Sequence, residues 1–380
     1  MFNHDSAPSP GFPASSVGRL VIKIGSALLV DPDGAIRIDW LRGVIEDIAQ
    51  RHAAGQQIIV VSSGAIALGA RRLSLPKGGR GSLDDAQAAA AVGQIALSHH
   101  WAGLLKDQGI TAGQMLLTLD DLEHRRRYLN AAATLERLMA LRVVPVINEN
   151  DSVATTEIRF GDNDRLAARI AQAAKADAVA LLSDVDGLYT ANPHSNPDAK
   201  LVRDVRKIDA HITDMADGGS GSGMGSGGMA SKIAAAKIAT SAGAHLAILS
   251  GLPERPLSAW ENGANGTIFH AQPSKGARQN WLAGRLTSKG RIMVDAGAEN
   301  ALRDGRSLLP AGVTQVEGRF VRGDVVDIIG TDGRLIARGL IEYDAEETTL
   351  IAGKRKSDIA ELLGQPVRPA LIHRNHMVLL

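Results

Sequence analysis

The sequence has no cysteine among its 380 residues, so a disulfide framework and thiol-based catalysis are both excluded. It also lacks an uninterrupted apolar run of about eighteen residues, which argues against a membrane-spanning helix. Residues 1–16 carry proline and serine but no hydrophobic core of the kind that a signal peptide needs. We therefore expect a disordered tail over residues 1–16 of a cytoplasmic protein with no membrane partner.

Neither sign of charge dominates, because the formal net charge is +1. Bulk electrostatics therefore does not point to a nucleic acid partner, although a local basic patch could still supply one. Aromatic residues make up 3% of the chain, which leaves few side chains on which bases could stack. The 380 residues, of which 44% are hydrophobic, are enough for two or three domains with buried cores.

Glycine is concentrated in Gly218–Lys232, where seven of the first eleven residues are glycine and a helix-forming run follows. Glycines let backbone N–H groups approach an anion closely, and a helix starting near Met229 directs the positive end of its dipole at the same place. Lys232 would add a full charge. The stretch predicts a phosphate-binding loop, with a flexible linker as the alternative. Its GxGxxG spacing is not a convincing dinucleotide fingerprint, because no strand-like run precedes it.

Four short apolar runs, typical of buried parallel strands, each end in a polar or glycine-containing cluster. In open parallel sheets, ligands bind at the carboxyl ends of the strands, so the four clusters predict one site at one edge of the sheet. The runs and their clusters are Val21–Ile24 with Gly25–Ser26, Ile58–Val61 with Ser62–Ala65, Val143–Ile147 with Asn148–Asp151, and Val179–Leu182 with Ser183–Tyr189.

Lys23 and the segment Gly161–Asp164 each have two interpretations. Lys23 interrupts an apolar run, so it needs an anionic partner if the strand is buried on both faces, whereas an edge strand would leave it in solvent. The segment Gly161–Asp164 directly precedes a helical run, where aspartate and asparagine commonly cap the helix. The functional alternative is that its carboxylates orient Lys23 and Lys232 or hold a metal.

Six motifs occur in order along the chain: Lys23–Ser26, Val61–Ala65, Gln114–Thr118, Val146–Asp151, Gly161–Asp164 and Gly227–Lys232. Together they resemble the motif set of the glutamate 5-kinases, within the amino acid kinase superfamily, and the resemblance covers nearly the whole chain. Three features depart from the family pattern: a longer glycine loop, Ser231 where threonine is common, and an N-terminal extension through about Ser16.

Strand-like and helix-like runs alternate from about Leu20 to Ala271, which predicts an α/β fold. The resemblance implies the amino acid kinase fold, a three-layer αβα sandwich with a mostly parallel central sheet. Helices are expected at Asp39–Ala54, Leu83–Gln108, Leu129–Leu141, Asp164–Lys175 and Met229–Ala242.

Beyond this region, short β-type runs separated by glycine turns predict a small β-rich domain. Ser307–Val313 and Phe320–Val326 resemble the PUA domain that many bacterial glutamate 5-kinases carry at their C-terminus. The predicted organisation is a tail over residues 1–16, a kinase domain over 17–272, a linker over 273–285 and a PUA-like domain over 286–370. The β-type runs are Arg291–Val294, Val325–Ile329, Leu335–Leu340 and Thr348–Ile351.

The resemblance implies ATP-dependent phosphorylation of the γ-carboxylate of L-glutamate to γ-glutamyl phosphate, the first intermediate on the route to proline. A γ-carboxylate has an unperturbed pKa of about 4.3 and is already ionised at neutral pH, so no general base is required. The chemical problem is repulsion between this carboxylate and the phosphates of ATP, which cations must offset. ATP and Mg2+ are the expected cofactors, and no metal ligand is assigned.

The resemblance also implies roles for residues that match the family motifs. Lys23 and Lys232 would stabilise the transferred phosphoryl group and the leaving β-phosphate, and Asp164 would hold the two lysines in place. The matching nucleotide-binding positions are Lys23, Ser183, Asp184, Ser226, Gly227, Gly228, Met229, Ala230, Ser231 and Lys232.

Ser63, Asp151 and Asn163 match the glutamate-binding positions of the family. In this interpretation Ser63 donates a hydrogen bond and Asp151 pairs with the α-ammonium group of the substrate. The expected partners are L-glutamate and ATP, with proline as a feedback inhibitor, the next enzyme of the pathway as a candidate partner, and a homo-oligomeric assembly.

Two alternatives stay open at this point. Another amino acid kinase, acting on acetylglutamate or aspartate, would share the fold, but the INEND and GDND motifs and the PUA-like tail point away from it. An RNA-binding PUA protein with a degenerate kinase domain belongs to a different class. Intact Lys23, Asp164 and Lys232 argue against this class, and Lys354–Lys356 is typical of a solvated turn, so RNA is not expected as a partner.

Overall fold

The computed structural model describes residues 12–13, 15–153, 163–193, 195–217, 228–272, 288–363 and 370–380. The chain divides into two compact units. Unit 1 consists of Met1–Glu123 and Asn130–Pro273, and unit 2 consists of His124–Leu129 and Ser274–Leu380. Most of the predicted tail over residues 1–16, and the whole predicted linker over 273–285, lie outside the described residues.

Unit 1 is built on an eight-stranded sheet with the strand order β3-β4-β2-β1-β5-β9-β10-β8. Neighbouring strands from β3 to β9 are parallel, and β10 runs antiparallel to β9. The near-continuous apolar sequences of β1, β2, β4 and β5 fit strands that are buried along almost their whole length. The strands are β1 (Arg19–Ile24), β2 (Gln57–Ser62), β3 (Ala112–Leu117), β4 (Val144–Glu149), β5 (Ala178–Ser183), β8 (Asp204–Val205), β9 (His245–Ser250) and β10 (Gly266–Phe269), with β6 (Leu188–Tyr189) and β7 (Leu201–Val202) forming a separate two-stranded ribbon.

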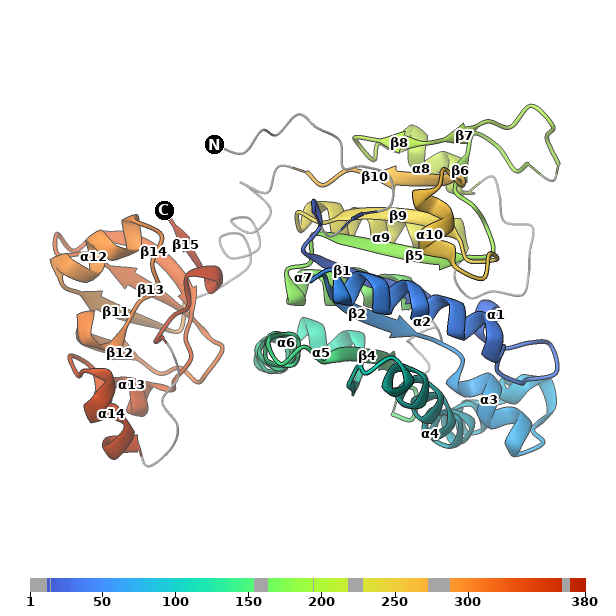
Figure 1. Ribbon diagram of the computed structural model, residues 1–380. Coiled ribbons are helices and arrows are strands. Elements are labelled where there is room, and N and C mark those ends of the chain that lie inside the picture. Colours follow the sequence, from blue (N-terminus) through green and yellow to red (C-terminus); the bar gives the residue numbers. More distant parts are fainter. Residues whose placement is uncertain are drawn as a thin grey trace. The chain divides into compact units, whose positions relative to one another are not determined.

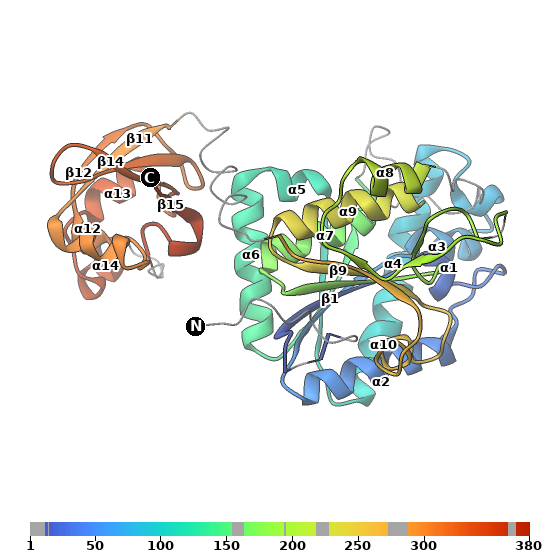
Figure 2. The ribbon, with the colours of Figure 1, turned by 90° about the horizontal axis from the view of Figure 1, so that it is seen from above.

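Helices cover both faces of this sheet, so unit 1 has the three layers of the predicted αβα sandwich (Figure 1). Seen from above, α7 and α9 lie on one side of the sheet, and α2 and α10 lie on the other (Figure 2). Side chains of α2, α4 and α10 share one hydrophobic cluster with the sheet. The helices are α1 (Ser26–Leu29), α2 (Ile38–Ala53), α3 (Ala65–Arg72), α4 (Leu83–Asp107), α5 (Leu119–Glu123), α6 (Arg125–Ala140), α7 (Asn163–Ala174), α8 (Ala210–Asp217), α9 (Met229–Ser241) and α10 (Pro256–Glu261).

All five helices expected from the sequence are present. The bounds of α2, α4, α7 and α9 agree with the predicted ones to within one residue at each end. Helix α6 begins at Arg125, four residues before the predicted start, because its first turn is polar and carries no apolar periodicity. None of the helices within the described ranges is long and apolar enough to cross a membrane.

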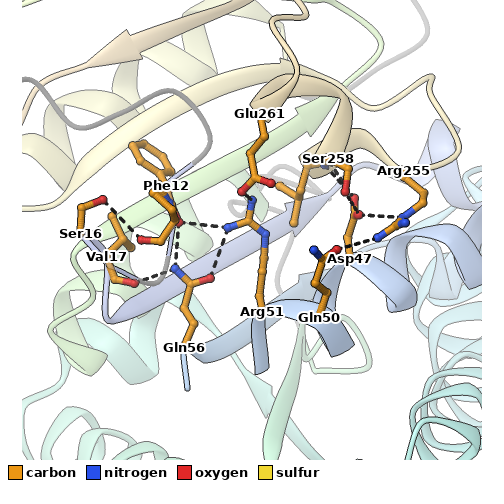
Figure 3. A network of polar contacts seen from close by, with 12 residues as sticks. Phe12, Ser16, Val17, Asp47, Gln50, Arg51, Gln56, Arg255, Ser258 and Glu261 are labelled. Carbon is orange, nitrogen blue, oxygen red and sulfur yellow. Dashed lines mark hydrogen bonds and ion pairs between the residues drawn. The ribbon is translucent and has the colours of Figure 1, made fainter. Parts of the chain in front are cut away.

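The start of the described chain is anchored in the core of unit 1. The predicted tail includes Phe12, but in the structure this side chain is fully buried and its ring packs edge-on against Trp260, with the ring centroids 5.0 Å apart. Arg51 and Gln56 donate hydrogen bonds to the carbonyl oxygen of Phe12 at 3.0 and 2.9 Å, and Arg51 forms an ion pair with Glu261 at 2.5 Å (Figure 3). These contacts satisfy the buried Arg51 guanidinium and attach the segment to α2 and α10.

Unit 2 contains the β-rich domain expected from the sequence. Its five-stranded sheet has the order β12-β11-β13-β14-β15 and encloses a core of its own. Leu129, from the short segment His124–Leu129, is buried in this unit with Val325, Leu340 and Val378. The elements are β11 (Gly290–Val294), α12 (Ala296–Arg303), β12 (Val313–Gly318), β13 (Val325–Ile329), β14 (Leu335–Leu340), α13 (Ala345–Ile351), α14 (Lys356–Leu363) and β15 (Met377–Leu379).

One predicted strand of unit 2 is wrong. Thr348–Ile351 forms the second half of helix α13, although its β-branched residues favour a strand. The helix is set by its first residues, because Asp344 and Glu347 form a reciprocal capping box. The Thr348 hydroxyl then donates to the carbonyl oxygen of Asp344 at 2.6 Å, so it is satisfied within the helix.

Candidate active site

The four polar clusters expected at strand ends lie next to one another. Their strands are consecutive in the sheet, in the order β4-β2-β1-β5, and all four run in the same direction. Ile24 at the end of β1 is in register with Ser62 of β2 on one side and with Leu182 of β5 on the other. The carboxyl ends of these strands therefore form one edge, which is where open parallel sheets bind ligands.

A buried charge cluster lies at this edge, formed by Lys23 on β1, Asp164 on α7 and Lys232 on α9. The two ammonium groups contact opposite oxygens of one carboxylate: Lys23 Nζ lies 2.6 Å from Asp164 Oδ1, and Lys232 Nζ lies 3.0 Å from Oδ2. The exposed fractions are 7% for Lys23, 1% for Asp164 and 5% for Lys232. The structure thus supplies the anionic partner that a lysine inside a buried strand requires.

The electrostatics of this cluster keep its carboxylate ionised. Burial acts to raise the pKa of Asp164, but the charges and hydrogen bonds of Lys23 and Lys232 outweigh burial and hold that pKa below its ordinary value. The three side chains of the cluster together carry an excess of positive charge. Such an excess is suited to attract and stabilise an anion.

Helix α9 adds a second source of positive potential. Its N-cap is Gly228, whose backbone is extended and which provides no side-chain hydrogen bond to the first turn. The helix dipole directs partial positive charge out of this end, and Lys232 lies in the first turn. Met229, Ala230 and Ser231 form the rest of that turn, whereas the predicted nucleotide-binding residues Ser226 and Gly227 lie outside the described residues.

The end of β5 presents the remaining predicted nucleotide-side residues. The Ser183 hydroxyl is buried and donates to Asp184 Oδ1 at 2.9 Å, while Asp184 itself is exposed. Since β5 is the immediate neighbour of β1, these two residues lie on the strand next to the one that carries Lys23.

Asn163, the first residue of α7, is held by its amide nitrogen. This nitrogen shares its two hydrogens among three acceptors: the Ser63 hydroxyl at 2.6 Å, the Asn148 side-chain oxygen at 3.1 Å and the Ser62 carbonyl oxygen at 3.2 Å. The Asn163 side-chain oxygen is buried and has no hydrogen-bond partner among the described residues. An unpaired buried acceptor is costly, so its presence beside Ser63 indicates a place for a donor group of a ligand.

A cavity of about 460 Å3 opens beside these residues, between α4, β3 and the end of β4. Its lining combines small apolar side chains with carboxylates and amides, which suits a small polar molecule. The lining residues are Ala65, Ala90, Ala91, Gln94, Ile95, Ser98, Gln114, Leu116, Glu149, Asn150, Asp151 and Ser152.

Asp151, in the cavity wall, has a perturbed acidity. Burial raises its pKa to about 6, while the positive charge of Arg80 acts in the opposite direction. Its Oδ1 atom is buried without a hydrogen-bond partner among the described residues. A carboxylate kept in this state is prepared to receive a cationic group, because pairing would remove the cost of its burial.

Close packing of α3 against α4 shapes this cavity. A Cβ atom on Gly93 would overlap the carbonyl oxygen of Ala65, and one on Gly69 would overlap the carbonyl oxygen of Ala89. Glycine at both positions therefore lets the two helix backbones touch. This contact brings Gln94, the residue after Gly93, into the cavity wall opposite the end of β4.

The structure thus brings together Lys23, Asp164 and Lys232, and separately Ser63 and Asn163, with Asp151 in the neighbouring cavity. The sequence interpretation missed Gln94 and Arg80. Gln94 follows an alanine-rich helical run and a glycine, and that glycine was the available signal of a close helix contact. Within the described ranges, no group of three or more histidine, aspartate or glutamate side chains is placed to hold a metal ion.

Two family models match the chain. The model described as the amino acid kinase family matches residues 18–250, and the model described as the PUA domain matches residues 290–363. The chain therefore belongs to the amino acid kinase family and carries a PUA domain.

Curated relatives extend this match to nearly the full length. A glutamate 5-kinase of Sphingopyxis alaskensis is 63% identical over 97% of this chain and 99% of that relative. A glutamate 5-kinase of Zymomonas mobilis is 63% identical over 95% and 91%, and one of Novosphingobium aromaticivorans is 58% identical over 97% of each chain. The resemblance to the glutamate 5-kinases that the six motifs indicate is confirmed.

Proposed function

We propose that the chain transfers the γ-phosphoryl group of ATP to the γ-carboxylate of L-glutamate, yielding γ-glutamyl phosphate and ADP. The observation that carries this proposal is the buried Lys23–Asp164–Lys232 cluster at the edge of the sheet, where Lys232 belongs to the first turn of α9. Full-length relatives at 63% identity that bear the name glutamate 5-kinase support the choice of acceptor. The product is the first intermediate on the route to proline.

The acceptor amino acid is assigned to the cavity. Asp151 Oδ1 and Asn163 Oδ1 are both buried and without partners among the described residues, which supports a donor group such as an α-ammonium group as the partner of each. The Ser63 hydroxyl accepts from Asn163, which leaves its own proton for a carboxylate oxygen of the substrate. This arrangement supports the proposed roles of Ser63, Asp151 and Asn163 in glutamate binding.

The reaction then needs positioning and charge stabilisation. The glutamate γ-carboxylate attacks the γ-phosphorus of ATP, and the bond from that phosphorus to the oxygen bridging to the β-phosphate breaks. Negative charge increases on the leaving β-phosphate, where Lys232 and the start of α9 are positioned to stabilise it. Lys23 stabilises the phosphoryl group in transfer, and Asp164 holds both lysines without taking a proton because its pKa is low.

Mg2+ fits this site as an ion carried by the phosphates. The described residues offer no cluster of three acidic or histidine ligands, and Asp164 is occupied by two lysines. Mg2+ is commonly bound through substrate phosphates with one or two carboxylates at most. When bound, it would supply further neutralisation of phosphate charge.

Regulation and assembly form a further part of the proposal. Proline shares the α-carboxylate and the α-nitrogen of glutamate but has no γ-carboxylate, so it is expected to compete for the groups around Asp151 and Asn163. Inhibition by proline should weaken as glutamate rises, which steady-state kinetics at several glutamate concentrations would reveal. The segment Ser152–Phe160, mostly outside the described residues, is expected to govern this sensitivity, and a homo-oligomer is the expected assembly.

The acceptor can be tested by ADP release with matched amino acids. L-Glutamate should give turnover well above the rate without acceptor, whereas L-aspartate and N-acetyl-L-glutamate should stay near that background. N-Acetyl-L-glutamate is the sharper control, because it keeps the γ-carboxylate and removes only the cationic nitrogen assigned to Asp151. Preferred turnover of either control over glutamate would assign the site to another amino acid kinase.

A further inference from the structure

The cavity wall contains a chain of amide hydrogen bonds that reaches Asn163 from α4. Gln94 is half-buried and lines the cavity, and its side-chain oxygen accepts a hydrogen bond from the Asn148 amide nitrogen at 2.8 Å. Asn148 is 2% exposed, and its side-chain oxygen in turn accepts from Asn163. Three side chains from α4, β4 and α7 are therefore joined in one line.

Backbone groups determine which atom donates and which accepts in the hydrogen bonds that join Gln94, Asn148 and Asn163. Asn148 Oδ1 also accepts from the backbone N–H of Glu149 at 2.9 Å, so the oxygen of this amide must face Glu149 and Asn163. The Asn163 nitrogen faces the Ser62 carbonyl oxygen, which can only accept. Turning either amide over would place oxygen against oxygen.

At the α4 end of this series of hydrogen bonds, the orientation of the Gln94 amide is set by Ser98. Its amide nitrogen donates to the Ser98 hydroxyl at 3.3 Å, and that hydroxyl donates to the backbone carbonyl oxygen of Gln94 at 2.8 Å. The Gln94 oxygen is thereby left facing Asn148, and among the described residues it is the one acceptor of the buried Asn148 amide nitrogen. Without it, the Asn148 side chain would keep the two hydrogen bonds that its oxygen accepts, but its buried amide nitrogen would have no acceptor.

We propose that Gln94 is a positioning residue for the α-ammonium group of the acceptor amino acid, acting through Asn148 to keep the Asn163 side-chain oxygen directed at the substrate. This inference rests on the proposed function, because it takes the ammonium group as the donor to Asn163 Oδ1. The glycine before Gln94 fits this role. Gly93 lets α4 pack closely against α3 at the point where Ala65 and Gln94 line the cavity.

The test compares two ligands that differ only in the amino group. Gln94→Met keeps the size of the side chain and removes both hydrogen bonds. It should raise the KM for glutamate about tenfold, as expected for loss of a partner that orients a binding group, with the KM for ATP changed by less than about twofold. Glutarate, the same dicarboxylate without the amino group, should inhibit the variant with an unchanged inhibition constant. Gln108→Met, the same exchange at the exposed end of α4, is the matched control and should behave like the parent.

A double-mutant cycle tests whether Gln94 affects glutamate binding through Asn163. In an Asn163→Ala background, Gln94→Met should change the KM for glutamate by less than about twofold, because the oxygen that it orients is gone. A full-sized effect in that background would overturn the inference, and so would an equal weakening of glutarate and glutamate.

Gln94→Glu covers the case in which the methionine variant does not fold. Its carboxylate keeps the acceptor for Asn148, so the ratio of the glutamate KM to the glutarate inhibition constant should not rise above that of the parent. A tenfold rise of this ratio in Gln94→Glu would contradict the role given to the acceptor. If the parent protein does not turn over glutamate, the proposed function is overturned. If the parent turns over glutamate normally and Gln94→Met does not raise the KM for glutamate selectively over the inhibition constant of glutarate, only this inference is overturned.

Discussion

Lys23 and Lys232 come from distant parts of the chain and share a single carboxylate, so each can be removed without leaving Asp164 unpaired. Lys232→Ala should lower turnover by at least about two orders of magnitude, the usual effect of losing one preorganised charge stabiliser. Steady-state ADP release measures this. Lys237→Ala, at an exposed position on the same helix, is the control and should keep parental turnover. Near-normal turnover of Lys232→Ala would remove this lysine from the catalytic machinery.

Asp151 should impose a pH dependence on glutamate binding. Its folded pKa is about 6, so the carboxylate proposed to pair with the α-ammonium group is lost as the pH falls through that value. The kcat/KM for glutamate should be flat above about pH 7 and fall roughly tenfold per pH unit below 6. Asp151→Asn should lose this inflection and raise the KM for glutamate far more than the KM for ATP. Equal rises in both KM values would mean that Asp151 belongs to the architecture.

The raised pKa of Asp151 also predicts that the protein loses stability as the pH rises. A carboxyl whose folded pKa lies above its unfolded value contributes stability when protonated and loses that contribution as the pH rises through about 6. Asp151→Asn should therefore unfold at a higher temperature than the parent at pH 8, with the difference shrinking toward pH 4. Thermal unfolding without substrates measures it. A variant less stable than the parent at pH 8 would show that Asp151 has a stabilising partner in the fold.

At the scale of elements, the α3–α4 contact links folding to the cavity. Gly93→Ala forces a methyl group against the carbonyl oxygen of Ala65, and such overpacking typically costs about 1–3 kcal/mol. Because Ala65 and Gln94 both line the cavity, the KM for glutamate should rise together with the loss of stability. Gly103→Ala on the same helix meets nothing within 4 Å and should be neutral or slightly stabilising. Thermal unfolding and steady-state kinetics measure both effects in the two variants. Equal unfolding temperatures and equal KM values for glutamate in Gly93→Ala and Gly103→Ala would contradict the packing argument.

Elements differ in how well the sequence predicts them. Helices with clear apolar periodicity, such as α7 and α9, have the expected bounds, whereas Thr348–Ile351 is helical because a capping box overrides its strand propensity. The Lys23, Asp164 and Lys232 cluster is foreseeable because motifs mark all three residues. Gln94 is not, because its place depends on two helices touching at Gly93, and that contact exists only in the folded chain.

At the scale of the whole molecule, the matched phosphate and substrate motifs described by the structure all lie in unit 1. A chain ending near Gln279 should therefore keep measurable glutamate kinase activity. Unit 2 also includes His124–Leu129, so this truncation removes Val325, Leu340 and Val378 from around buried Leu129. Exposing a buried leucine costs about 1.5–3 kcal/mol, so the truncated chain should unfold at a lower temperature. A folded but wholly inactive product would show that the β-rich unit completes the active site.

The identity of the product tests the central claim most directly. The chain is incubated with ATP, L-glutamate and hydroxylamine, which converts an acyl phosphate into the corresponding hydroxamate, and the product is identified by mass spectrometry against authentic α- and γ-glutamyl hydroxamate. The Lys23–Asp164–Lys232 cluster and the proposed ammonium site at Asp151 and Asn163 predict the γ-hydroxamate, formed in proportion to ADP and lost in Lys232→Ala. ADP release without any hydroxamate, or formation of the α-hydroxamate, would contradict transfer to the γ-carboxylate.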